Sequence, residues 1–323
     1  MRKGLLKDAG IVPLILRRAG SAVLTLLLVS VVIFTIASLL PGDAAQEVLG
    51  QSATAEQVAA LREQMGLDRP APVRYVEWLV ALLQGDPGYS FVANLPVAQI
   101  ISERLPNSLL LAGLTAVVAV PLALLIGIVA AVRRGSAIDR VLNIITLSLV
   151  AIPEFLVATV GVLIFSVYLL WLPSIALVSD EATTGEMLRS LALPILSLAA
   201  VVIAQMARMT RAAVADQLDR PYVEMALLKG VRFPRIVLFH VMPNAIGPIV
   251  NAIALSLSFL MGGAIIVETI FNYPGLASLM VNAVTSRDMS LLQACAMIFC
   301  AAYLALILVA DIVAILANPR LRS

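Results

Sequence analysis

Six long and mostly apolar stretches recur along the chain, and this feature restricts the possible folds more than any other. Apolar runs of about 18 residues or more are typical of helices that cross a membrane. Only 13% of the 323 residues are charged, whereas a soluble domain of this size would need more charged side chains to cover its surface. The sequence therefore predicts an all-α polytopic membrane protein with six transmembrane helices. We place these spans at Leu14–Leu40, Pro106–Val132, Val141–Trp171, Leu191–Met209, Pro243–Val267 and Leu291–Leu316.

The third predicted span is long for a hydrocarbon core of about 30 Å, so we expect it to be tilted or bent. Pro153 lies near its middle and is the expected place of a bend, because proline disrupts the hydrogen bonding of a helix. Glu154 follows, and an ionisable side chain at this depth is unfavourable, which makes it a candidate charge of a transport pathway. The alternative is a protonated or hydrogen-bonded glutamate that satisfies backbone groups at the bend.

The distribution of basic residues predicts the orientation. If both termini are cytoplasmic, most of the 22 lysines and arginines lie on the inner side, as the positive-inside rule requires. Residues 1–13 then form a basic cytoplasmic lead, and residues 14–323 form a single transmembrane domain. We attribute the pI near 8.7 to the basic inner loops, and we expect no nucleic-acid binding because no basic stripe is interleaved with aromatic residues.

The segment 41–105, between the first two spans, is the largest stretch outside the membrane and is placed on the outer side. Thr54 and Gln57 have the spacing of a capping box and predict the start of a helix. A second, amphipathic helix is expected after Pro72, and a third short helix at Pro96–Arg104 leads into the second span. We therefore expect this segment to be folded.

The segment 211–242 forms an unusually apolar cytoplasmic loop, a property that marks a protein interaction site. Ala226 allows close approach, and Gly230 allows the positive φ that ends a helix at a defined angle. Pro234 suits the first turn of a second helix, and Pro243 suits the start of the fifth span. The loop is thus predicted to be a pair of helices that lie across the inner face of the membrane.

No catalytic or metal-binding constellation is expected. The chain lacks the phosphate-binding motif G-x-x-x-x-G-K-[ST], and His240 is its only histidine. For His240 we prefer a contact at an interface over a titrating switch. Cys295 and Cys300 lie five residues apart on one span, and we interpret them as small apolar packing residues. The prediction is a protein that is not an enzyme, holds no metal and binds no cofactor of its own.

The segment 222–243 has the form E-x-A-x-x-x-G, followed thirteen residues after the glycine by a proline. It closely resembles the coupling loop of the permease subunits of ATP-binding-cassette importers. The resemblance implies that the loop docks into a groove on an ATPase subunit. Its candidate residues are Tyr222, Glu224, Ala226, Gly230, His240 and Pro243. Met225 replaces an alanine of the family's E-A-A core, and His240 stands where many members carry isoleucine.

A second motif is similar to the signature of the oligopeptide/dipeptide/nickel branch of these permeases. It reads V-E-T-I-F-N-Y-P-G-L over 267–276 and is followed by Arg287-Asp288. We place it in a periplasmic loop, Glu268–Ser290. Its candidate residues are Glu268, Phe271, Pro274, Gly275, Arg287 and Asp288. Further matches are Leu40-Pro41-Gly42-Asp43, Gly66-Leu67-Asp68, Tyr75-x-x-Trp78-Leu79 and Arg104-Leu105-Pro106-Asn107-Ser108.

The resemblance covers essentially the whole chain and implies the type I importer permease fold in the bacterial cytoplasmic (inner) membrane, in contact with membrane lipid. A second homologous permease subunit would complete the translocation pathway, and two ATP-binding-cassette ATPase subunits would hold ATP and Mg. A periplasmic or lipid-anchored substrate-binding protein would deliver the cargo to the outer segments 43–102 and 269–289. Di- or oligopeptides are the expected cargo, with nickel chelates, glutathione and sugars as alternatives.

The alternative from another class is a transporter driven by an ion gradient. It would need paired intramembrane carboxylates or interrupted helices in symmetric halves, and the sequence shows a lone Glu154 and no inverted repeat. In an importer, Glu154 could attract the α-amino group of a peptide. Asp311, near the inner end of the last span, is expected to form a structural ion pair. Its candidate partners are Arg208, Arg211 and Arg320.

Overall fold

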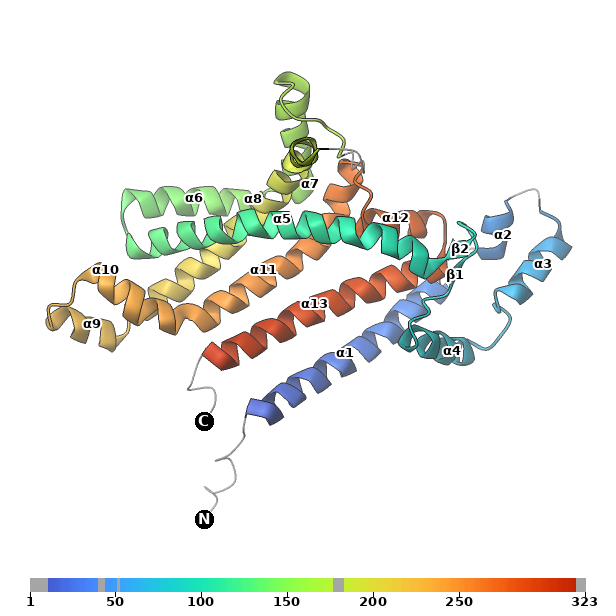
Figure 1. Ribbon diagram of the computed structural model, residues 1–323, viewed down its shortest axis with the longest axis horizontal. Helices are drawn as coiled ribbons and strands as arrows, with labels where there is room; N and C mark the ends of the chain where they lie inside the picture. Colours follow the sequence, from blue (N-terminus) through green and yellow to red (C-terminus); the bar gives the residue numbers. More distant parts are fainter. Residues whose placement is uncertain (1–10, 40–43, 51–52, 177–182, 318–323) are drawn as a thin grey trace, which may run out of the picture. The chain divides into compact units, whose positions relative to one another are not determined.

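The computed structural model describes residues 11–39, 44–50, 53–176 and 183–317. Most of them are helical, and the one sheet within these ranges is an antiparallel pair of two-residue strands (Figure 1). The predicted all-α class is confirmed. The motif Leu40-Pro41-Gly42-Asp43, most of the predicted N-terminal lead, and Arg320 lie outside the described residues.

The elements follow one another with short connections. The first half of the chain contains α1 (Ile11–Leu39), α2 (Ala44–Leu49), α3 (Ala55–Gln64), α4 (Ala71–Leu83), β1 (Tyr89–Ser90), β2 (Leu95–Pro96), α5 (Val97–Val132) and α6 (Ala137–Ala151). The second half contains α7 (Glu154–Gly161), the π-helix η1 (Val162–Tyr168), α8 (Thr184–Leu218), α9 (Pro221–Leu228), α10 (Phe233–Ile236), the π-helix η2 (Val237–Val241), α11 (Met242–Ile270), α12 (Leu276–Thr285) and α13 (Met289–Ala317).

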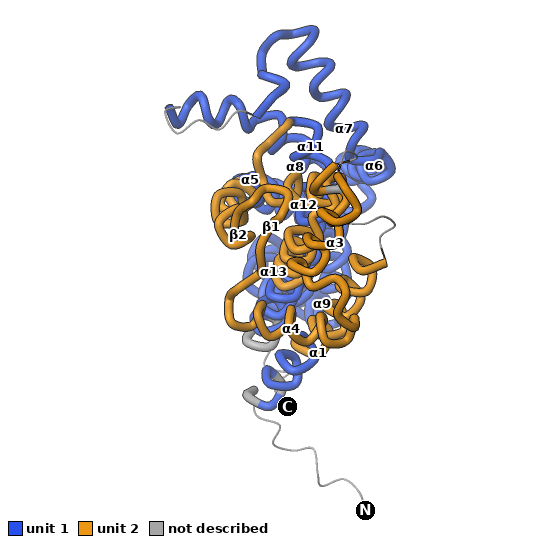
Figure 2. Tube along the Cα trace, turned by 90° about the vertical axis from the view of Figure 1, so that its right-hand side faces the viewer, with its two compact units in different colours: residues 1–22, 111–271, 303–323 blue, residues 23–110, 272–302 orange. Residues whose placement is uncertain are grey.

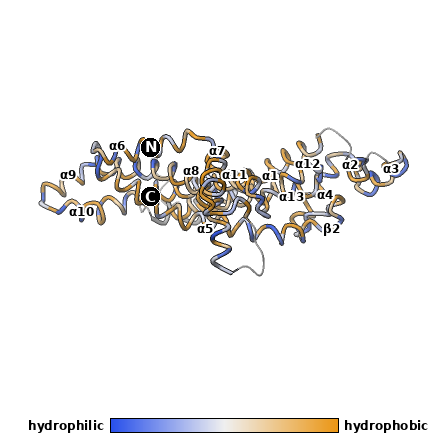
Figure 3. The backbone as a smooth tube through the Cα atoms, turned by 90° about the horizontal axis from the view of Figure 1, so that it is seen from above, coloured by the Kyte–Doolittle hydropathy of each residue, from blue (hydrophilic) through white to orange (hydrophobic). Residues whose placement is uncertain are grey.

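Five helices in the described ranges are long and apolar enough to cross a membrane, and a bent pair makes a sixth if it counts as one span. This agrees with the six predicted spans. The bent pair is α6 with Glu154–Tyr168, and its two halves are bent by 100° at Ile152 and Pro153, so the predicted bend is confirmed. Figure 3 shows how apolar α1, α5, α11 and α13 are, and how hydrophilic residues gather on α3.

The predicted boundary at Pro106 is wrong, because no separate short helix precedes the second span. α5 is continuous from Val97 through Pro106 to Val132. Its first turns are held by packing, since Val97 and Ile101 are buried in a cluster with Leu276 and residues of α13. A membrane helix tolerates an internal proline where its neighbours stabilise the turns on either side.

Two further boundaries are displaced. α8 runs to Leu218, so the first residues of the predicted loop 211–242 continue the fourth span instead of leaving it. The predicted loop Glu268–Ser290 is also partly wrong, because Glu268 lies in the last turn of α11 and α12 occupies its middle. Glu268 is fully buried, which explains why the helix continues past the predicted end at Val267.

The chain divides into two compact units (Figure 2), one of residues 1–22, 111–271 and 303–323, and one of residues 23–110 and 272–302. In the first unit, α8 and α11 pack together, and many of their buried side chains are small, as is usual where membrane helices approach closely. In the second unit, α5, α12 and α13 share an apolar cluster that includes Val97, Leu276 and Cys295. The single domain expected over 14–323 stays a prediction.

The segment after α1 is folded as expected. Thr54 and Gln57 form the predicted capping box: the Thr54 N–H donates to Gln57 Oε1 at 2.9 Å, and the Gln57 N–H donates to Thr54 Oγ1 at 3.3 Å. α4 begins at Ala71 with Pro72 in its first turn. Tyr75 anchors α4 on α1, because its hydroxyl shares a hydrogen bond of 2.9 Å with Ser30 and its ring packs on Phe34 at 5.4 Å.

Candidate functional site

The predicted pair of helices in the loop after α8 is present. α9 begins at Pro221 directly after α8, and it ends in a Schellman motif in which Gly230 has φ +76°. The Gly230 N–H donates to the Leu227 carbonyl at 2.9 Å, and the Val231 N–H donates to the Ala226 carbonyl at 3.1 Å. The motif needs a left-handed residue at this position, which explains the glycine. Pro234 lies in the first turn of α10, as expected.

One face of this loop is buried against the helices. Val223, Ala226 and Ile236 are buried together with residues of three long helices. These neighbours are Ala131 of α5, Val214 and Ala215 of α8, and Ala245 and Ile249 of α11. The close approach predicted for Ala226 is therefore present, although it is made to the chain's own helices.

The other face of the loop is exposed and mixes apolar and charged side chains. Leu228 is 76% exposed, and Glu224 and Met225 are exposed beside it. Lys229, Arg232 and Arg235 surround Gly230 together with His240, whose Nδ1 is buried and has no hydrogen-bond partner among the described residues. A contiguous surface of this kind suits a protein partner.

Polar contacts hold the start of the loop to the end of α8 and to the connection between α5 and α6. The Tyr222 hydroxyl donates to Gln217 Oε1 at 3.1 Å, and the Arg134 guanidinium donates to Asp219 at 2.7 Å. Arg220 donates to the Asp216 carboxylate at 2.8 Å, and this hydrogen bond raises the pKa of Arg220 above its ordinary value. Arg220 therefore stays charged.

The chain enters α11 through a π-helical turn that was not predicted from the sequence. η2 covers Val237–Val241, and Pro243 follows in the first turn of α11. Proline has no N–H and its ring clashes with the carbonyl four residues earlier, and the wider π-turn relieves this conflict. The His240 carbonyl instead accepts a hydrogen bond of 2.6 Å from Asn244 Nδ2. Pro243 was the feature of the sequence from which this turn could have been predicted.

A buried ion pair, also not anticipated, joins α6 to α8. Arg211 donates to both oxygens of Asp139, from Nε at 2.7 Å and from Nη2 at 2.9 Å. Asp139 also accepts from the Gly135 N–H at 2.9 Å and from Asn143 Nδ2 at 2.6 Å. The expected pairing of Asp311 with an arginine of α8 is wrong, because Arg18 of α1 binds Asp311 at 3.0 Å, whereas the third expected partner, Arg320, lies outside the described residues. The prediction that Asp311 forms an ion pair is confirmed.

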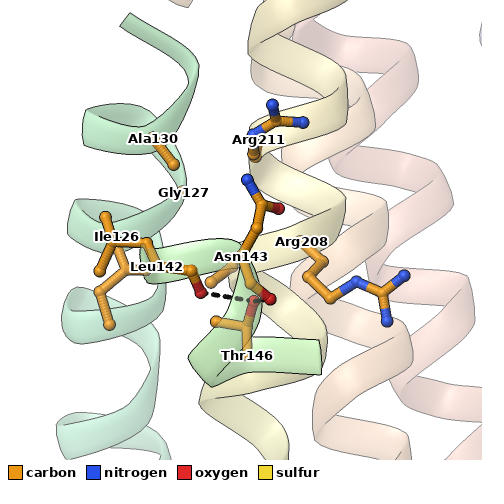
Figure 4. Close-up of a pocket in the computed structure, with 9 residues that line it drawn as sticks. Ile126, Gly127, Ala130, Leu142, Asn143, Thr146, Arg208 and Arg211 are labelled. Carbon is orange, nitrogen blue, oxygen red and sulfur yellow. Dashed lines mark hydrogen bonds between the residues drawn. The ribbon is translucent and has the colours of Figure 1, made fainter. Parts of the chain in front are cut away.

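Beside this ion pair lies a small hollow between α5, α6 and α8. Figure 4 shows Asn143 extending from α6 towards Arg211 of α8, with Gly127 and Ala130 of α5 to their left. Its volume is about 10 Å³, enough for about one water molecule, so it does not hold a ligand.

Two predicted motifs far apart in sequence meet in the second unit. The Tyr273 hydroxyl donates to the Asn107 carbonyl at 2.8 Å, and Asn107 Nδ2 donates to the Pro274 carbonyl at 2.8 Å. Ser108 Oγ accepts from the Leu276 N–H at 2.7 Å, at the start of α12. Tyr273 is almost completely buried. The segment 272–276 is therefore fixed to α5 by three hydrogen bonds.

The remaining signature residues have structural contacts of their own. Phe271 is buried at the end of α11, and its carbonyl accepts from the Ala176 N–H at 2.9 Å. Gly275 is the N-cap of α12, and Arg287 ends that helix with φ +55°. Asp288 caps α13 by accepting from the Leu291 N–H at 3.2 Å, and it also accepts a hydrogen bond from the Ser90 hydroxyl.

We expect Asn107→Ala to lower the free energy of unfolding by about 1 kcal/mol, because the Pro274 carbonyl loses its donor in a partly buried place. Thermal unfolding of the purified protein in detergent measures this change. Asn282→Ala is the matched control, since Asn282 is exposed on α12 in the same unit. Equal midpoints for both variants would contradict the proposed importance of this hydrogen bond for stability.

Glu154 is the first residue of α7 and lies at the break between the two halves of the bent pair. Its side chain is half-buried and rests on Gly263 of α11. Gly263 lies seven residues before Ile270, the last residue of α11, which corresponds to roughly 10 Å along the axis. The carboxyl group is therefore close to the end of α11 that is remote from the loop α9–α10.

Comparison with known proteins gives a consistent result. Residues 123–323 match the family described as binding-protein-dependent transport system inner membrane component, and residues 11–112 match its N-terminal membrane component. A putative peptide transport system permease protein of Brucella abortus (strain 2308) is 36% identical over 309 residues, which cover 96% of this chain and 98% of that protein. The glutathione transport system permease protein GsiC of Salmonella typhi is 36% identical over 308 residues, 95% of this chain and 98% of that protein.

Proposed function

The chain belongs to the family of inner membrane components of binding-protein-dependent transport systems, and from this premise we propose that it is a permease subunit of an ATP-driven importer of di- or oligopeptides. It is a multi-pass protein of the inner membrane. In this proposal the loop α9–α10 faces the cytoplasm, and the segments 43–102 and 269–289 face the binding protein outside.

The observation that carries the proposal is the two-sided loop of α9 and α10. Its exposed face presents Leu228 and Met225, whose contact with water is unfavourable until a partner covers them. Its other face is buried on α5, α8 and α11. A force that an ATPase subunit applies to the exposed face is therefore passed to the helices through close packing, because packed interiors deform little.

The proposal divides the work between chains. This subunit performs no chemistry, and two ATP-binding-cassette ATPase subunits bind ATP and Mg beneath it. A second homologous permease subunit completes the pathway, and a periplasmic or lipid-anchored protein delivers the cargo. The relatives named as peptide permeases support a peptide cargo. The relatives named as glutathione permeases support glutathione as the alternative within the same class.

We expect Gly230→Val to reduce ATP-dependent peptide uptake at least tenfold, because valine at φ +76° destroys the turn that orients α9. Glu224→Arg, on the exposed face, should have a similar effect. The measurement combines uptake by proteoliposomes that contain the complete transporter with co-purification of the ATPase subunits. Both quantities should fall together.

Gly85→Val is the matched control, since Gly85 also has a positive φ (+86°) and no atom near its missing Cβ, but lies outside the loop. It should leave co-purification of the ATPases unchanged. Normal uptake and co-purification in both loop variants would refute the docking role. Flux through the isolated chain in liposomes, driven by an ion gradient alone, would favour the secondary-transporter alternative.

A further inference from the structure

The break between α6 and α7 leaves backbone groups without partners. Pro153 has no N–H, and among the described residues no backbone amide donates to the carbonyls of Leu149 and Val150. Ile152 and Pro153 are exposed at the surface of this chain. Within a membrane, irregular backbone of this kind occurs where it is buried by protein or lines a water-filled cavity.

The carboxyl group of Glu154 fits a recess made by a glycine. A Cβ atom on Gly263 would lie 2.7 Å from Glu154 Oε2 and 3.2 Å from both Cδ and Oε1. The distance of 2.7 Å is too short for a real Cβ, so that any other residue at 263 would displace the carboxyl group. Gly262, the adjacent residue, has no atom within 4 Å of its own missing Cβ.

No positive charge in the described part of the chain neutralises Glu154. Its side chain has no ion pair and no hydrogen-bond donor there. It is the only formal charge of the packed segments, since Ser190–Ala207 of α8 and Met242–Val267 of α11 contain no Asp, Glu, Lys or Arg.

We propose that Glu154, seated on Gly263 at the break between α6 and α7, is a subsite for the primary ammonium group of the transported molecule. An ammonium group carries three donors, and the Glu154 carboxylate is an acceptor for them, as are the carbonyls of Leu149 and Val150 in the last turn before the break. The site lies near the end of α11 remote from the loop α9–α10, where cargo from outside would arrive first.

This inference rests on the proposed function, because it takes the cargo to be a peptide with a free amino terminus. The transporter, complete with its partner subunits, is reconstituted in proteoliposomes and supplied with one dipeptide in its free and its N-acetylated form. Glu154→Gln should lower uptake of the free dipeptide roughly tenfold or more, the expected effect of losing one charge-assisted hydrogen bond. The same substitution should leave ATP hydrolysis and the uptake of any transported N-acetylated dipeptide unchanged.

The two adjacent glycines provide a matched pair. Gly263→Ala should reproduce the loss seen for Glu154→Gln, because its methyl group displaces the carboxylate, whereas Gly262→Ala should transport normally. Yield and thermal unfolding confirm that each variant folds. If the wild-type transporter moves no dipeptide, the proposed function fails. If it does, and Glu154→Gln transports the free dipeptide normally or loses both forms equally, the subsite is refuted while the proposed function stands.

Discussion

Arg211→Ala is expected to lower the free energy of unfolding by about 3 kcal/mol. The substitution leaves the Asp139 carboxylate, whose side chain is 6% exposed, without its cation. Breaking a buried ion pair by removing one partner costs about 3–5 kcal/mol, and we expect the lower end because Arg211 itself keeps 27% of its surface exposed. Equilibrium unfolding in mixed detergent micelles measures the difference.

Arg220→Ala is the control for this prediction. Arg220 forms an exposed pair with Asp216 one helical turn away, and an exposed pair of this kind contributes little to stability. The double variant Asp139→Leu with Arg211→Leu should recover part of the loss, because it leaves no unpaired buried charge. An Arg211→Ala variant as stable as the wild type would show that the buried ion pair is not required for the packing of α6 on α8.

Gly127→Ala is expected to lower the free energy of unfolding by about 3 kcal/mol. The added Cβ would lie 2.6 Å from the carbonyl oxygen of Ala207 and 2.7 Å from Cβ of Thr210. The first of these atoms belongs to the backbone of α8, so that no side-chain rotation relieves the clash and α5 must move away. The same unfolding experiment measures this loss.

Gly113→Ala, on the same helix, should change stability in the opposite direction. No atom lies within 4 Å of the missing Cβ of Gly113, and alanine is favoured over glycine within a helix by up to about 1 kcal/mol. Comparing Gly127→Ala with Gly113→Ala separates the effect of close helix packing on stability from the effect of helix propensity. Two alanine variants with the same stability would contradict the close approach of α5 and α8.

The features that could be predicted from the sequence are those that depend on residues close together along the chain. Apolar runs predicted the spans, Pro153 predicted the bend, and Gly230 with Pro234 predicted the turn between α9 and α10. Each depends on local backbone chemistry or on burial along one segment, which a single sequence contains.

The features that could not be predicted depend on packing between distant segments. Asp139 and Arg211 are 72 residues apart, and Asn107 and Tyr273 are 166 residues apart, so nothing in either local pattern indicates its partner. Helix ends were misplaced for the same reason. α5 continues through Pro106 and α11 includes Glu268 because contacts elsewhere in the chain stabilise those turns.

The helical stretch Phe233–Ile270 is continuous over 38 residues, and this continuity has a mechanical consequence. At 1.5 Å per residue it is about 57 Å long, with the loop α9–α10 at one end and the recess at Gly263 near the other. A tilt of roughly 10° about its midpoint would move each end by about 5 Å in opposite directions. If the loop binds an ATPase subunit as proposed, one tilt of this helix would move the recess that holds Glu154 at the same time as the bound end, and neither movement would need a separate trigger.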